Sequence, residues 1–156
     1  MIRKQLLVLI AVIALAGVAS CASNPPKQAA IQGESALAAV RDLTKAYEKR
    51  DLDAFLDKVS LSYPDRESFK KSLQKVFSTY QTIRFSVQEA KMLITIQYQG
   101  SLKTVFTWAG EWQTAGGKIV KDGGRVTLVL DPGAYKLTAI EGKNPYLPTE
   151  TAMPVK

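Results

Sequence analysis

The chain has 156 residues, which is enough for one domain. Hydrophobic residues make up 46% and charged residues 22%, a balance that excludes a fully disordered chain and a multi-span membrane protein. The sequence contains one cysteine and no histidine, which excludes an internal disulfide, a Cys₂His₂ zinc site and Ser-His-Asp or Cys-His catalysis. The formal net charge is +7, with 21 Lys and Arg against 14 Asp and Glu.

The N-terminus has the pattern of a secretory signal peptide over residues 1–20. Arg3 and Lys4 precede an apolar run over residues 6–18. This run is shorter than the roughly 20 residues that a membrane-spanning helix needs, and its length is typical of the hydrophobic region of a signal peptide. The sequence therefore predicts export.

The segment after the apolar run reads Val18-Ala19-Ser20-Cys21. It resembles the lipobox of bacterial lipoproteins, which implies cleavage before Cys21 and lipidation of that residue with diacylglycerol and a further acyl chain such as palmitate. Two or three acyl chains hold a protein stably on a membrane. By the same resemblance, Ala22 in place of aspartate implies the outer membrane, facing the periplasm, in a Gram-negative cell. The alternatives are a plain signal peptide and a cysteine buried in a core helix.

Composition divides the rest of the chain into three parts. Residues 21–33 form the lipidated cysteine and a flexible tether, in which Pro25 and Pro26 favour extended backbone. Residues 34–142 form the folded domain. Residues 143–156 form a Pro-rich C-terminal tail, and we expect its Tyr146 and Leu147 to pack against the sheet.

Three amphipathic helices are predicted at the start of the domain. The first spans about residues 35–49 and carries its apolar residues at helical spacing. Asp51 is expected to cap a short second helix, and Asp65 to cap a third. The opposite face of the third helix is basic and is interpreted as solvated; it carries Lys70, Lys71 and Lys75.

After Tyr80 the hydrophobic period changes from 3.6 to 2, which indicates strands. Apolar residues alternate over 83–87, 92–98, 106–112, 126–130 and 135–139, and Gly110 is interpreted as a bulge or bend. The turns that separate the strands are predicted at Gly100-Ser101, Gly116-Gly117, Gly123-Gly124 and Asp131-Pro132-Gly133. Helices followed by strands joined by short connections predict an α+β fold with one curved antiparallel sheet against the helices.

Two stretches of the domain resemble nuclear transport factor 2-like (NTF2-like) domains. They are residues 46–56, where a helix ends in a charged turn, and residues 124–142, which resemble the closing hairpin of the family. The resemblance implies a cone of the SnoaL and cystatin-like type, with a pocket between sheet and helices and, in many members, a homodimer formed through the sheet. The main alternative is another small α+β lipoprotein domain with a different strand order.

No catalytic constellation or metal-ligating cluster stands out in the sequence. The carboxylates considered as proton-transfer groups are interpreted as surface charges or caps: Asp42, Asp51, Asp53, Asp57, Glu89, Glu111 and Asp131. The aromatic residues either fill the core or line an apolar pocket. The candidate pocket residues are Tyr47, Phe55, Phe77, Tyr80, Phe85, Trp108, Trp112 and Tyr135.

These patterns predict a lipid-anchored cell-envelope protein that binds a small apolar ligand or a protein partner without catalysis, cofactor or metal. Its membrane contact is the lipid on Cys21, and nucleic acid is not an expected partner of an exported domain. One alternative is a pocket enzyme of the same fold, of isomerase, dehydratase or hydrolase type, that uses an Asp or Tyr for proton transfer. Another is a purely structural role for a cone that is packed solid.

Overall fold

A computed structural model describes residues 25–93 and 100–149. The predicted signal peptide, Cys21 and the end of the C-terminal tail lie outside these residues. So does the part of the predicted second strand that spans residues 94–98.

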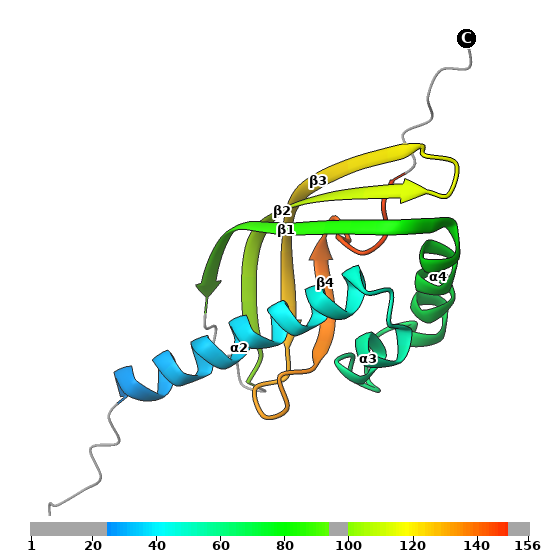
Figure 1. Cartoon of the computed structure of the whole chain (residues 1–156). Coiled ribbons are helices and arrows are strands. Elements are labelled where there is room, and N and C mark those ends of the chain that lie inside the picture. Colours follow the sequence, from blue (N-terminus) through cyan, green and yellow to red (C-terminus); the bar gives the residue numbers. More distant parts are fainter. Residues whose placement is uncertain (1–24, 94–99, 150–156) are drawn as a thin grey trace, which may run out of the picture.

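Helices come first along the chain, and all the strands follow them. The helices are α2 (Pro25–Glu48), α3 (Leu52–Asp57) and α4 (Arg66–Thr79), and the strands are β1 (Tyr80–Leu93), β2 (Leu102–Thr114), β3 (Ile119–Leu130) and β4 (Leu137–Gly142). The four strands form one antiparallel sheet in the order β1-β2-β3-β4. Helix α2 lies across one face of the curved sheet, with α3 and α4 at one end of it (Figure 1). The predicted α+β class and curved antiparallel sheet are confirmed.

The first helix begins at Pro25 rather than near Ser35. Residues 25–33, which the sequence placed in a flexible tether, are therefore helical. Proline is tolerated in the first turn of a helix because the N–H that it lacks has no intrahelical acceptor there. None of the described helices has the length and hydropathy of a membrane-spanning segment.

The two predicted N-caps have different outcomes. The Asp51 carboxylate accepts a hydrogen bond from the backbone N–H of Ala54 at 3.0 Å, so this cap is confirmed. Asp65 precedes α4 as predicted, but its backbone is left-handed, with φ of 52°, and its side chain makes no capping bond. A left-handed residue directs its side chain away from the first free N–H groups, which explains why that prediction was wrong.

The turns that connect the strands are mostly those expected. The β2–β3 hairpin turns at Gly116-Gly117, and the Asp131 carboxylate accepts backbone hydrogen bonds from Gly133 and Ala134. The prediction of a turn at Gly123-Gly124 was wrong, because both glycines lie within β3 and pair with β2. A Cβ atom at Gly123 would lie 2.9 Å from the carbonyl oxygen of Trp108, so a glycine permits this close approach of the two strands.

Candidate functional site

The inward face of β2 forms the wall of the candidate site. Trp108 and Trp112 are 1% and 0% exposed on this face, and Gly110 lies between them. A Cβ atom at Gly110 would lie 2.2 Å from the Trp112 ring, so the Trp112 indole occupies the space of the missing side chain. The pairing register with both neighbouring strands is continuous at Gly110. Gly110 is therefore a packing site for an indole and not the predicted bulge.

A hydrogen-bonded tyrosine lies at the centre of the domain. The hydroxyl of Tyr47, on α2, accepts a hydrogen bond from the Trp112 indole N–H at 2.8 Å. The same hydroxyl donates to the backbone carbonyl of Tyr146 at 2.9 Å. This one group connects the first described helix, the sheet and the C-terminal part of the chain, and burial raises the pKa of Tyr47 well above its ordinary value.

Tyr146 is part of the core, although the candidate pocket list did not include it. Its side chain is 0% exposed. Its ring centroid lies 4.8 Å from that of Phe55, 5.1 Å from that of Tyr47 and 5.9 Å from that of Phe85. The sequence predicted that Tyr146 packs against the sheet. It did not show that the Tyr146 ring enters the centre of the aromatic cluster.

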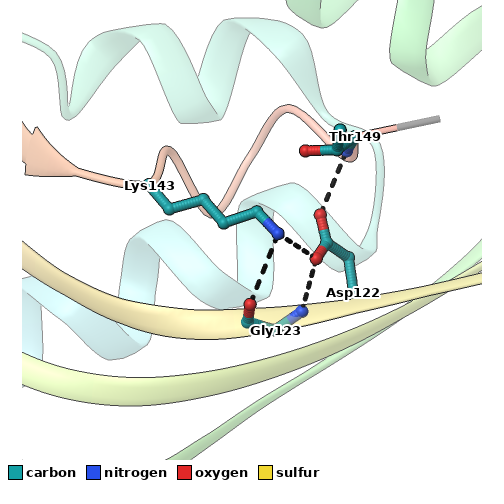
Figure 2. A network of polar contacts seen from close by, with 4 residues as sticks. All are labelled: Asp122, Gly123, Lys143 and Thr149. Carbon is teal, nitrogen blue, oxygen red and sulfur yellow. Dashed lines mark hydrogen bonds and ion pairs between the residues drawn. The ribbon is translucent and has the colours of Figure 1, made fainter. Parts of the chain in front are cut away.

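The residues after β4 cross back over β3, and we call residues 143–149 the closing segment. Figure 2 shows that the Lys143 ammonium and the backbone N–H of Thr149 both reach the Asp122 carboxylate, which also accepts from the N–H of Gly123. The Lys143 ammonium also lies 5.8 Å from the centroid of the Trp108 ring. Burial by itself raises the pKa of Asp122, but Lys143 and the two N–H groups outweigh it and lower that pKa below the ordinary value. Sequence reasoning missed Asp122 because an Asp before Gly-Gly resembles a turn.

The candidate pocket residues pack against one another. Ring contacts with centroids 5.5 to 6.3 Å apart join Tyr47 to Phe55, Phe77 and Phe85, and Trp108 to Phe85 and Trp112. Tyr80 is buried at the end of α4, and its carbonyl accepts from Arg50 at 3.2 Å. Tyr135 is half-buried in the turn before β4 rather than in the predicted strand, with φ of 54°. These rings are thus part of, or packed against, one hydrophobic core between the helices and the sheet.

In the part of the chain that the structure describes, the carboxylates and the cationic side chains lie around the core rather than in it. Among the residues whose burial the structure describes, Thr104 is the only buried polar or charged one outside the tyrosines and tryptophans. Glu111 faces outward, 3.4 Å from Arg84 and 3.2 Å from Lys121 on the two neighbouring strands. Asp42, Asp53 and Asp57 are exposed, and the side chain of Glu89 lies outside the described residues. The described residues contain no cluster of three or more His, Cys, Asp or Glu that would hold a metal ion.

Hollows lie on the surface of the domain. A groove of about 380 Å³ lies between α2 and β1, lined by Leu37, Val40, Arg41, Thr44, Lys45 and Val87. A second hollow, of about 360 Å³, lies between α4 and the closing segment and includes Lys75, Tyr80 and Leu147. Of the candidate pocket residues, Tyr80 borders one of these two hollows.

No protein-family model matches the sequence, and no curated protein sequence shows significant similarity to it. Solved structures do resemble the fold. An NTF2-like superfamily protein from Salmonella enterica is 10% identical with a TM-score of 0.60, over 75% of this chain and 92% of that one. A conserved protein from Planctomyces limnophilus is 14% identical with a TM-score of 0.59, over 69% and 92%.

An enzyme is also among the similar structures. The BvnE pinacolase from Penicillium brevicompactum is 10% identical with a TM-score of 0.57, over 69% of this chain and 83% of that one. At these identities the likeness concerns the fold and not the reaction. Three helices packed on one curved antiparallel sheet, together with these similarities, show that the chain has the α+β NTF2-like fold.

Proposed function

We propose that the protein is a lipid-anchored protein of the bacterial cell envelope whose NTF2-like domain binds a small apolar ligand or a protein partner without catalysis. The observation that carries the proposal is the apolar groove between α2 and β1, which lies outside the aromatic cluster of the core. Small-molecule sites are mostly apolar and measure roughly 300–1,000 Å³, and the volume of the groove lies within this range.

The chemistry of the interior favours binding over proton transfer. A general acid or base works best with a pKa near the working pH. Burial raises the pKa of both Tyr47 and Tyr146 above the ordinary tyrosine value, so each phenol stays protonated and neutral. Both phenols therefore serve better as packed core groups than as acids or bases.

The lipobox at residues 18–21 supports the anchor. Helix α2 starts at Pro25, soon after Cys21 in the sequence. In a Gram-negative cell, Ala22 after the cysteine supports an outer-membrane position facing the periplasm. A domain that is anchored to a bilayer by lipid meets apolar and amphipathic molecules at high local concentration.

Fractionation of host cells tests the anchor. The Cys21→Ser variant is expected to leave the detergent-soluble membrane fraction and appear in the soluble envelope fraction. The matched control is Ser20→Ala, which keeps a small residue before the cysteine and is expected to stay in the membrane. Membrane retention of Cys21→Ser would overturn the lipoprotein assignment.

Native mass spectrometry of the Cys21→Ser chain, purified gently from the host envelope, tests the binding function. A co-purifying small molecule of defined mass supports binding of a small ligand. Cross-linking to one envelope protein in intact cells supports binding of a protein partner. Turnover of a substrate by the purified protein would contradict the non-catalytic assignment.

A further inference from the structure

The groove between α2 and β1 has an apolar floor that the fold itself leaves uncovered. Ile83 and Phe85 precede Val87 on the inward face of β1 and are 4% and 7% exposed, whereas Val87 is 36% exposed. The pairing register shifts between Val87 and Glu89, and such irregularities redirect side chains. An inward-facing valine is therefore left open beside α2, next to the buried Val40.

The helix side of the groove combines apolar and polar groups at helical spacing. Leu37, Val40 and Thr44 lie along one face of α2, over about 12 Å from Leu37 to Lys45. The Thr44 hydroxyl is buried and has no hydrogen-bond partner among residues 25–93 and 100–149. Because this hydroxyl is enclosed, the surface that the helix offers to a ligand in the groove is mainly apolar.

Two cationic side chains, those of Arg41 and Lys45, lie one turn of α2 apart and line the same groove. Arg41 and Lys45 are exposed, and within the described residues no ion pair involves either side chain. The nearby carboxylate of Glu48 is engaged on β1, where it accepts the backbone N–H of Phe85 at 2.8 Å. The groove therefore presents positive charge at one side of an apolar floor, which is complementary to an anionic headgroup on an alkyl chain.

We propose that this groove binds a single-chain amphiphile with an anionic headgroup, specifically a long-chain carboxylate. The carboxylate pairs with Arg41 and Lys45, and the alkyl chain covers Leu37, Val40 and Val87. This inference rests on the proposed binding function and names its ligand class and site. The aromatic core takes no part in it.

Calorimetric titration of the full chain carrying Cys21→Ser tests the proposal, with dodecanoate below its critical micelle concentration as the probe. One dodecanoate is expected to bind per chain, more tightly than dodecanol and dodecyltrimethylammonium. Shortening the probe to decanoate is expected to weaken binding, by up to about fourfold per methylene if the chain is fully covered. Equal affinity for the anionic and cationic probes would overturn the headgroup assignment and leave the proposed function standing.

Charge reversal at the groove locates the site. Arg41→Glu with Lys45→Glu is expected to weaken dodecanoate binding by about tenfold or more, which corresponds to about 1.4 kcal/mol, and to leave dodecanol binding unchanged. The control Lys71→Glu with Lys118→Glu changes net charge equally at exposed sites outside the groove and is expected to bind as before. Equal weakening by both pairs would overturn the groove as the site.

Substitution of the floor gives a second readout that does not depend on charge. Val87→Ser is expected to reduce the affinity gain from decanoate to dodecanoate, and circular dichroism of each variant verifies the fold. Binding of anionic vesicles without binding of free dodecanoate would overturn the single-chain ligand. If no probe binds while native mass spectrometry still finds a co-purified molecule, the inference fails and the proposed function stands.

Discussion

The hydroxyl of Tyr47 donates a hydrogen bond to the carbonyl of Tyr146, a residue 99 positions further along the chain. Both side chains are fully buried, and their ring centroids lie 5.1 Å apart. Tyr146 therefore anchors the closing segment in the core. The same hydroxyl accepts a hydrogen bond from the Trp112 indole N–H, so one oxygen atom is the hydrogen-bond partner of two buried groups.

Tyr47→Phe should destabilise the domain although it removes a single oxygen atom. The Trp112 N–H and the Tyr146 carbonyl would each lose their hydrogen-bond partner in the core, at about 1–3 kcal/mol per group. We expect a total loss of about 2–4 kcal/mol in the free energy of unfolding, measured by denaturant titration. The control Tyr63→Phe removes the hydroxyl of a half-buried tyrosine outside this network and should cost much less; equal costs would show that the network adds little.

Gly110→Ala should be far more disruptive than a glycine-to-alanine change usually is. The new Cβ would lie 2.2 Å from the Trp112 ring and would displace the indole from its position. Overpacking of this kind costs about 1–3 kcal/mol, and loss of the bond to Tyr47 adds to it. Gly116→Ala is the matched control, because its nearest neighbour would be 3.9 Å away, and thermal unfolding compares the two. Similar melting temperatures would contradict the packing role of Gly110.

Asp122→Asn should weaken the attachment of the closing segment at neutral pH by about 1–2 kcal/mol, since Lys143 is partly solvated. The folded-state pKa of Asp122 is below its ordinary value, so the unfolded chain binds the proton first as the pH falls. The stabilisation is present above about pH 4 and is lost below it. The stability difference between wild type and Asp122→Asn should therefore shrink on going from neutral to acidic pH. A constant difference would show that the charge of Asp122 contributes nothing.

Alkaline pH should destabilise the domain through Tyr47 and Tyr146. Burial raises the pKa of both phenols, so the unfolded chain loses these protons at about pH 10, where the folded chain keeps them. The stability is present below that pH and falls as the pH rises above it. The ultraviolet absorbance of tyrosinate should show these two phenols ionising together with loss of near-ultraviolet circular dichroism. Their free ionisation in the folded protein would mean that the core is open to water.

Trp108→Ala should cost about 3–5 kcal/mol, because its side chain is buried and contacts Phe85 and Trp112. The indole N–H of Trp108 has no hydrogen-bond partner among the described residues, so Trp108→Phe removes no bond and should cost clearly less. Denaturant unfolding of both variants compares the loss of the whole ring with the loss of part of it. A near-neutral Trp108→Ala would place the residue in a binding role instead of the core.

Periodicity predicted much of this fold because it reflects which face of an element is buried. The change of period at Tyr80 divided helices from strands, and the alternation over 106–112 placed Trp108 and Trp112 on the inward face with Glu111 outward. The turn at Asp131 and the helix cap at Asp51 were also predictable from the sequence, since each depends on hydrogen bonds between residues that are close in the chain. The predictions of a signal peptide and a lipobox, and the absence of histidine, likewise rest on the sequence alone.

Contacts between distant residues were decided by the tertiary structure alone. Gly123 and Gly124 have the composition of a turn, yet they lie in β3 because two strands approach closely there. In the sequence, Asp122 resembles a turn residue. In the structure, the chain returns over β3, and the Asp122 carboxylate accepts hydrogen bonds from Lys143 and Thr149. Whether the aromatic residues would line a pocket or fill it depended on Tyr146, whose ring enters from the C-terminal part of the chain. A one-dimensional pattern records which residues are apolar, whereas the volume that they leave empty is set by how all of them pack together.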